Sequence, residues 1–344
     1  MLFGVVAITK HLWDCLRAGL KGLAIWGLLG AFQVTHAAQV WAPKNPIEIV
    51  VPTTPGGTTD ATARLVQKIL QENGLVKVPV TVVNRPGGGG VVSIAYLNQH
   101  GGDGHYVSVN TPNVIANDLT GRSPIRYTEI TALANFSTEH TAVAVRADSP
   151  IRTGQDFVDR LRRDPGSLAV STPTTLGSIN HMAFGLLAKA AGVDVRKLKA
   201  VVLGSGGGDA VTTLLGGHID AHIGTAASVA RMVEAGKIRV IAIAASRRMS
   251  GLYADVPTWT EQGYPVVMST WRGLIGPRGM TREQIAFWDD ALSRVAATDT
   301  WKKAAEAGNW ESNYLNSNET RKLFDSNYAE YRSILTDLGM IKGK

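Results

Sequence analysis

The chain has 344 residues, a mass of 36.7 kDa, a formal net charge of +7 at pH 7 and a mean hydropathy of +0.02. Hydrophobic residues make up 44% and charged residues 18%, so the chain is too apolar for a disordered tail and too polar on average for a polytopic membrane protein. This length predicts about two domains. Lysine and arginine are scattered without interleaved aromatic residues, which argues against a nucleic-acid partner.

The first 38 residues predict an export signal. Basic residues precede an apolar run over 23–32, and small residues around Ala37 and Ala38 form a cleavage site. A retained membrane anchor is the less favoured alternative, because the run is shorter than the roughly 20 apolar residues of a spanning helix. The single cysteine, Cys15, lies in this leader. We therefore expect a periplasmic mature chain without disulfides, thiolate catalysis or cysteine zinc sites.

From residue 46 onward, apolar runs of strand length alternate with stretches of helical period, which is typical of a wound α/β sheet. We expect strands at 47–51, 80–83, 106–109, 141–145, 168–170, 199–203, 219–223, 240–244 and 266–270. A first helix is expected after the first glycine-rich turn, with residues 65, 66, 69 and 70 on its buried face. Further helices are expected at 91–97, 155–162, 180–191, 209–215, 228–235, 282–296, 300–307 and 318–337. Segments 141–145 and 266–274 are expected to cross between two lobes as a hinge, with the ligand site in the cleft.

Two glycine-rich loops follow predicted strands and precede predicted helices. The first, 55–60, combines two glycines with Thr58 and Asp60, and the second, 84–90, ends in four successive glycines. Bare backbone amides and unpaired helix N–H groups suit a carboxylate ligand. For the first loop, the alternative is an ordinary tight turn with Asp60 placed against the helix dipole. Neither loop is a P-loop, and the second departs from the dinucleotide fingerprint at Val92.

The hydroxyl-rich segment 171–178 leads into a helix that contains His181. Such hydroxyls are helix caps by default. Ser178, three residues before His181, raises the alternative of a secreted hydrolase. Neighbours on one helix face do not make a nucleophile and base without an oxyanion site and an orienting acid, and the G-x-S-x-G elbow is absent.

Two further patterns, one around His218 and one at Trp271, each allow both a functional and a structural interpretation. His218, Asp220 and His222 alternate along a predicted strand and would face the same way. A metal site is one interpretation, and the solvent side of a strand is the favoured one. Trp271 follows the possible hinge, where packing between lobes is favoured over closing on a ligand.

A series of short motifs runs through the chain. They are Pro55-Gly56-Gly57-x-x-Asp60 with Ala63-Arg64, Asn84-Arg85-Pro86-Gly87-x-Gly89-Gly90, Gly104-His105-Tyr106, Gly177-Ser178-x-x-His181, Leu214-Leu215-Gly216-Gly217-His218-Ile219-Asp220, Pro257-Thr258-x-x-Glu261-x-Gly263 and Trp271-x-Gly273. In this order and spacing they resemble the extracytoplasmic solute receptors of the tripartite tricarboxylate transporter family, often called Bug proteins. The match extends over nearly all of residues 45–340.

The resemblance implies an α/β fold of the periplasmic-binding-protein-like (type II) Venus-flytrap kind, with two lobes joined by a two-strand hinge. Lobe 1 would comprise 45–142 plus 270–344, and lobe 2 would comprise 143–269. The resemblance also implies a receptor and not an enzyme, with no cofactor and no metal, that delivers a small organic acid to a permease of one large and one small integral-membrane subunit. We expect a monomer. The implied ligand-binding positions are Thr54, Gly56, Gly57, Thr58, Asp60, Gly87, Gly88, Gly89, Ser171, Thr174, Gly177, Ser178 and His181.

The sequence departs from this family in the second lobe. Residues 173–175 are Pro-Thr-Thr where relatives are often richer in glycine, and Gly204-Ser205 stands where they often carry an aromatic and a basic residue. Gly224 stands where an Asp is often found. The loss of a cation and an acid from the second lobe argues against a tri- or dicarboxylate. It is compatible with a monocarboxylate, or with an acid that has a neutral polar or aromatic distal part. A ligand sensor for a membrane signalling kinase is an alternative that keeps the fold.

Overall fold

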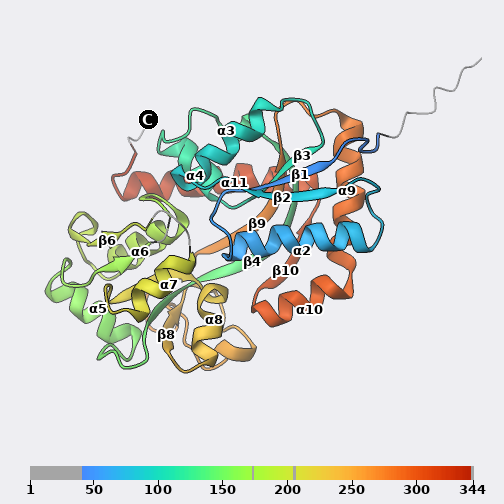
Figure 1. The fold of residues 1–344 in the computed structure, drawn as a ribbon. Helices are drawn as coiled ribbons and strands as arrows, with labels where there is room; N and C mark the ends of the chain where they lie inside the picture. The colour runs from blue at the N-terminus through green and yellow to red at the C-terminus, as the bar shows by residue number, and fades with distance from the viewer. Residues whose placement is uncertain (1–40, 173, 204–206, 342–344) are drawn as a thin grey trace, which may run out of the picture. The chain divides into compact units, whose positions relative to one another are not determined.

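A mixed β-sheet runs through the part of the chain that the structure describes, residues 41–172, 174–203 and 207–341 of a computed structural model (Figure 1). One part of the sheet has the order β2 (Val80–Asn84), β1 (Ile47–Val51), β3 (Tyr106–Asn110), β9 (Ser269–Gly276) and β4 (Thr131–Arg146), and β10 (Glu311–Leu315) also pairs with β4. The other part continues from β4 through β7 (Ala221–Thr225), β5 (Val170–Ser171) and β6 (Ala200–Val201), and β8 (Ile238–Ile243) also pairs with β4. The leader, Cys15, Pro173 and Gly204-Ser205 lie outside the described residues.

Helices cover both parts of this sheet (Figure 1). The α-helices are α2 (Thr58–Glu72), α3 (Val91–Gln99), α4 (Asn113–Leu119), α5 (Gly154–Arg163), α6 (Ile179–Ala190), α7 (Gly207–Leu215), α8 (Ala226–Glu234), α9 (Arg282–Ala297), α10 (Asp299–Gly308) and α11 (Ser317–Asp337). None of the helices in the described ranges is long and apolar enough to cross a membrane.

Long strand β4 belongs to both parts of the sheet. Its residues 131–140 pair with β9, and its residues 141–146 pair with β7 and β8. Thr141 donates its amide and its hydroxyl to the carbonyl of Met268, at 3.1 and 3.2 Å. The two segments that were expected to cross between lobes therefore meet side by side at this point.

Apolar packing is organised around the two parts of the sheet. One cluster joins β1, β3, α2 and α9 and includes Trp288, which is 0% exposed. A second cluster, around Ala144, Val229 and Tyr253, packs α8 against β4 and β8. The largest cluster extends across α5, α6 and α11 and includes Trp271. Burial at about 25 cal/mol per Å² makes these clusters the main source of stability.

The expected strands and helices differ from the observed ones where the sequence lacks a clean period. The segment 131–140, helix α4 and strand β10 were not predicted. Strand β10 reads Glu-Ser-Asn-Tyr-Leu with its first three residues exposed, so only its last two positions carry an apolar signal. Strand β7 begins at Ala221 and not at residue 219. The prediction that His218, Asp220 and His222 share one strand face is therefore wrong.

Candidate functional site

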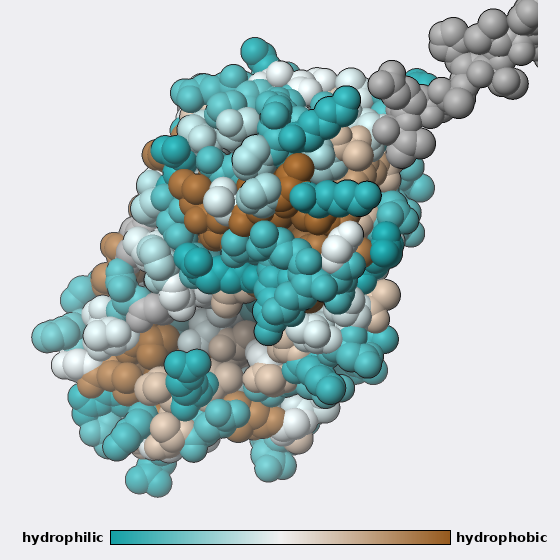
Figure 2. Space-filling model, turned by 45° about the vertical axis from the view of Figure 1, so that its right-hand side comes forward, coloured by the Kyte–Doolittle hydropathy of each residue, from teal (hydrophilic) through white to brown (hydrophobic). Residues whose placement is uncertain are grey.

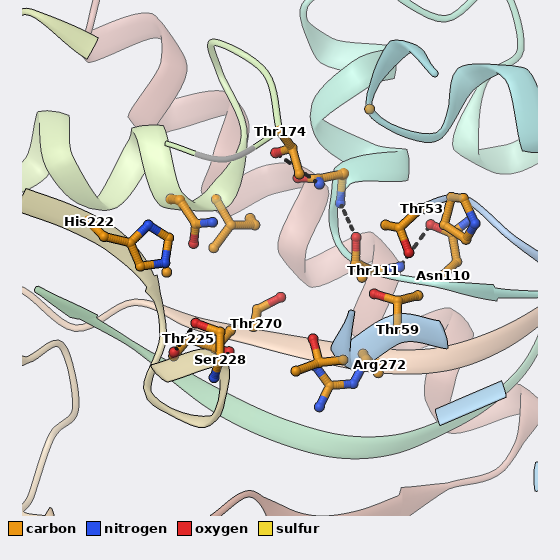
Figure 3. Close-up of a pocket in the computed structure, with 17 residues that line it drawn as sticks. Thr53, Thr59, Asn110, Thr111, Thr174, His222, Thr225, Ser228, Thr270 and Arg272 are labelled. Atoms are coloured by element: carbon orange, nitrogen blue, oxygen red, sulfur yellow. Dashed lines mark hydrogen bonds between the residues drawn. The ribbon is translucent and has the colours of Figure 1, made fainter. Parts of the chain in front are cut away.

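A polar pocket of about 110 Å³ lies where the two parts of the sheet meet (Figure 3). Hydroxyl and amide side chains dominate its lining, and Arg272 is the only charged side chain in it among the described residues. The lining residues are Pro52, Thr53, Thr58, Thr59, Gly89, Asn110, Thr111, Asn113, Thr174, Ile179, Asn180, His222, Gly224, Thr225, Ser228, Thr270 and Arg272.

The N-terminus of α2 opens onto this pocket. Its N-cap is Gly57, and no side chain caps its first turn, whereas Thr58 and Thr59 line the cavity. The first amides of a helix carry a partial positive charge and have no intrahelical partner. Beside them lies Asn110, which is 3% exposed and whose Nδ2 donor has no partner among the described residues. This side of the pocket thus offers hydrogen-bond donors that suit an anion.

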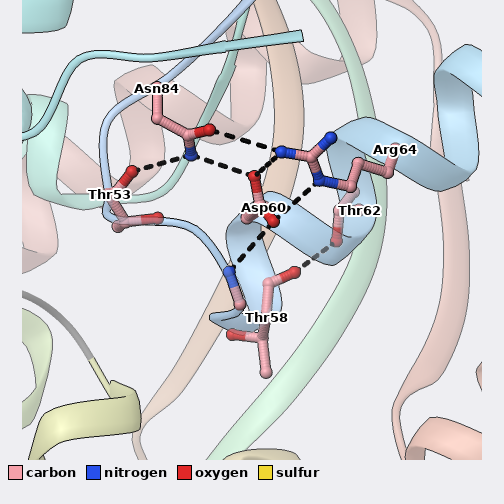
Figure 4. A network of polar contacts seen from close by, with 7 residues as sticks. Thr53, Thr58, Asp60, Thr62, Arg64 and Asn84 are labelled. Atoms are coloured by element: carbon pink, nitrogen blue, oxygen red, sulfur yellow. Dashed lines mark hydrogen bonds and ion pairs between the residues drawn. The ribbon is translucent and has the colours of Figure 1, made fainter.

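Asp60 holds the first glycine loop in place and does not line the pocket (Figure 4). Its Oδ2 accepts hydrogen bonds from the amide of Gly56 (3.0 Å) and from Nε of Arg64 (2.9 Å), and its Oδ1 accepts one from Nδ2 of Asn84 (2.9 Å). Burial alone would raise the pKa of Asp60, but the hydrogen bonds from Arg64, Gly56 and Asn84 lower it below the ordinary value. The carboxylate therefore acts as a structural tie between the loops after β1 and β2.

The second glycine loop adopts the backbone that only glycine takes readily. Residues 87–90 have φ values of 132°, 59°, 65° and 105°. Four successive glycines are expected where a loop needs bare amides or positive φ values, and the positive φ values are observed. Gly89 lines the pocket, and its carbonyl accepts a hydrogen bond of 3.0 Å from Nδ2 of Asn117. A Cβ at Gly89 would lie 2.8 Å from Cγ2 of Thr175, so the loop also lies close to the segment 171–178.

The segment 171–178 contributes Thr174 to the pocket, where it accepts a hydrogen bond of 3.4 Å from Asn113. Ser178 is the N-cap of α6, and its hydroxyl accepts from the amide of His181 at 3.5 Å. His181 Nδ1 in turn accepts from the amide of Gly177 at 3.1 Å. Burial, with a smaller contribution from Arg122, lowers the pKa of His181. Ser178 and His181 thus serve the turn before α6 and do not form a nucleophile and base pair.

The positions expected from the resemblance separate into three groups. Thr58, Gly89 and Thr174 line the pocket. Gly56 and Gly57, again with Thr58, line an adjoining cavity of about 690 Å³ that also contacts Ser228 and Arg272. Figure 2 shows one face of the molecule hollowed between its upper and lower parts. Outside the lining of both cavities lie Thr54, Asp60, Gly87, Gly88, Ser171, Gly177, Ser178 and His181.

Arg272 is a pocket residue that the sequence interpretation passed over. It is 4% exposed, forms an ion pair with Glu139 across β4 and β9, and donates from Nε to the hydroxyl of Thr62 at 3.0 Å. Burial lowers the pKa of Arg272 to about 10, which leaves it protonated at neutral pH. An arginine inside an otherwise apolar strand was the available signal. Asn110, Thr111, Asn113, Thr225 and Ser228 were missed as well.

Neighbouring Trp271 packs on α11, and the favoured packing between lobes stays a prediction. It is 4% exposed, its ring stacks on Phe324 with centroids 4.9 Å apart, and its Nε1 donates to Asn327 at 2.8 Å. His218 is exposed, and Asp220 accepts a hydrogen bond of 2.7 Å from the amide of Ala169. Within the described ranges, no three histidine, cysteine, aspartate or glutamate side chains gather into a possible metal site.

Comparison with solved structures identifies the class of protein that has this fold. A solute-binding protein from Polaromonas, described as a TctC protein without ligand, is 25% identical, covers 86% of this chain and 99% of its own, and superposes with a TM-score of 0.64. MatC of Rhodopseudomonas palustris with bound malate is 23% identical, covers 85% of this chain and 99% of its own, and gives a TM-score of 0.76. The fold is that of the two-lobed periplasmic solute-binding proteins.

Sequence comparison then gives the family. The family model described as tripartite tricarboxylate transporter family receptor matches residues 62–340. BugT of Bordetella pertussis is 31% identical over 243 residues, which cover 69% of this chain and 72% of BugT. The chain belongs to the tripartite tricarboxylate transporter receptor family, whose members are solute-binding receptors and not enzymes.

Proposed function

We propose that the protein captures a small organic carboxylate in the polar pocket and delivers it to a membrane carrier of the tripartite tricarboxylate type. One observation supports the assignment of the ligand class. The uncapped N-terminus of α2 and the side-chain Nδ2 of Asn110, which has no hydrogen-bond partner among the described residues, face the same cavity. The malate in the R. palustris relative is a carboxylate, which agrees with this class.

The carboxylate lies, in this proposal, against Thr58, Thr59 and Gly89. A helix N-terminus contributes about 0.3–1 kcal/mol to an exposed anion and up to about 2 kcal/mol in a partly buried site. Arg272 adds a positive charge at the same cavity, although Glu139 balances most of it. Amides that are already in position lose little entropy on binding, so the site needs no flexible lysine.

Binding is coupled to closure in this proposal. Residues 45–142 plus 270–344 form lobe 1, residues 143–269 form lobe 2, and β4 and β9 form the hinge. The pocket takes Thr58, Gly89 and Asn110 from the first lobe and Thr174 and His222 from the second. A ligand that contacts both sets shifts the population toward the closed state. The closed receptor, a monomer, then docks on a permease of one large and one small integral-membrane subunit.

A thermal-shift screen of the exported chain against small carboxylic acids tests the function. The true ligand, at 100 times its Kd, stabilises the folded state by about 2.7 kcal/mol, which corresponds to a rise in Tm of roughly 5–10 °C. The primary amide of the same acid serves as control and leaves the Tm unchanged. If no acid raises the Tm, or if acid and amide raise it equally, the carboxylate assignment is wrong. Recovery of every ligand unaltered by mass spectrometry separates a receptor from a hydrolase.

The leader gives a second expected result. Mass spectrometry of protein collected from the periplasm should find an N-terminus near Ala38 or Gln39, because the small residues there suit signal peptidase. The double variant Ala37→Arg, Ala38→Arg should retain the leader and provides the control. Absence of the wild-type protein from that fraction would contradict the predicted export, and an intact Met1 on protein in that fraction would contradict the predicted cleavage.

A further inference from the structure

The ring of His222, on β7, lies at the side of the pocket opposite Thr53 and Asn110 (Figure 3). It is 0% exposed, and its Nδ1 is 2.8 Å from the hydroxyl of Ser171 on β5. Its Nε2 has no hydrogen-bond partner among the described residues. A buried polar atom without a partner is unfavourable, so such an atom at a pocket points to a polar group of the ligand as its partner.

The space around this ring depends on Gly224, two residues further along β7. A Cβ built on Gly224 would collide with Nε2 of His222 and would lie 3.1 Å from the hydroxyl of Ser228. The ring cannot swing aside freely, because Ser171 holds its other nitrogen. Glycine at this position therefore leaves the Nε2 edge of the imidazole at the wall of the pocket.

The helix ends on this side of the pocket differ from that of α2. Ser178 caps α6 by accepting from the amide of His181, and Thr225 caps α8 by accepting from the amide of Ser228. Only α2, of these three helices in the described residues, starts with a glycine that offers no cap. The preference for a full negative charge is thus strongest at α2 and weaker beside His222.

Among the residues that the structure describes, Arg272 is the only charged side chain that lines this pocket. Burial lowers the pKa of His222 to about 4, with no charged neighbour among the causes, so the ring is neutral at neutral pH. Arg272 already pairs with Glu139. A second carboxylate beside the imidazole would lose its hydration without gaining a cation, which is costly in a buried site.

We propose that His222 is a specificity-determining residue that binds an uncharged oxygen group of the ligand, so that the cargo is a hydroxy- or oxo-carboxylic acid and not a dicarboxylate. This inference rests on the proposed function, which places the carboxylate at α2. A hydroxyl suits either tautomer of the ring, because it can accept from a protonated Nε2 or donate to a bare one. A carbonyl oxygen suits the Nε2–H tautomer.

Calorimetric titration of the exported chain with matched acids tests the inference. The probes are the n-alkanoate, the ω-hydroxyalkanoate and the α,ω-dicarboxylate with four, five and six carbons. In one of the three lengths, the hydroxy acid should bind at least about 10-fold more tightly than both partners of equal length. His222→Phe, which keeps a ring but removes both nitrogens, should reduce this preference to under about 3-fold. Gly224→Ala should act in the same direction by displacing the ring.

His218→Phe is the matched control, because His218 is exposed and does not line the pocket. It should leave all affinities unchanged. If the dicarboxylate binds more tightly than the hydroxy acid, or if His222→Phe keeps the preference for hydroxyl, the inference is wrong while the proposed function stands. If none of the nine acids binds and no acid of the thermal-shift screen raises the Tm, the proposed function fails and the inference falls with it.

Discussion

Replacing Gly57 by aspartate should abolish carboxylate binding without unfolding the protein. Gly57 has φ −81° and ψ 172°, and a Cβ there meets nothing within 4 Å, so a side chain fits without strain. The new carboxylate would cap α2 and occupy the place of the ligand. Two like charges about 4 Å apart repel by about 4 kcal/mol at an effective dielectric constant of 20. We expect a loss of affinity of at least about 100-fold by calorimetry, with the Tm unchanged or slightly raised.

Two control variants separate charge from bulk at the same position. Gly57→Ala adds a side chain that cannot cap, and its affinity should stay within about 3-fold of the parent. Gly57→Asn caps the helix without a negative charge and should give an intermediate loss. If Gly57→Asp binds as well as Gly57→Ala, the ligand carboxylate does not lie at the N-terminus of α2.

Arg272→Met should destabilise the protein by about 3–5 kcal/mol, because it leaves the carboxylate of Glu139 buried without its partner. Glu139 is 2% exposed, and its side-chain oxygens have no other hydrogen-bond partner among the described residues. Urea denaturation monitored by tryptophan fluorescence measures the loss. The double variant Arg272→Met, Glu139→Gln should recover most of it, because no buried charge then lacks a partner.

An exposed ion pair provides the comparison for this experiment. The side chains of Lys189 and Asp337 are 53% and 51% exposed and form an ion pair at 2.7 Å. Lys189→Met should cost only about 1 kcal/mol or less, since solvent screens the pair. Equal losses in Arg272→Met and in the double variant would show that burial of Glu139 does not set the cost, and would contradict the explanation.

The local features of the site could be predicted from the sequence, because they depend on a few neighbouring residues. The glycines of 87–90 take positive φ, and Ser178 caps its own helix. Each of these results needs only a short stretch of chain and the ordinary preferences of its residues. The apolar strands β1 and β3 were predicted for the same reason.

Pocket residues brought together by distant pairing could not be predicted in this way. Arg272 and Glu139 become partners only when β9 pairs with β4, and Asn110 reaches the cavity only because β3 lies beside β9. His222 was noticed as one of an alternating set, but a strand that begins two residues later separates it from His218. The register of a sheet is a property of the whole fold.

The position of β9 also bears on the order in which the chain can acquire its structure. Strand β9 fills the gap between β3 and β4, although it follows both by more than a hundred residues. Until residues 269–276 are available, β3 and β4 each present an open edge to any passing strand. The N-terminal part of the sheet therefore cannot be completed until the last third of the chain is available, and early segments depend on protection of these edges in the meantime.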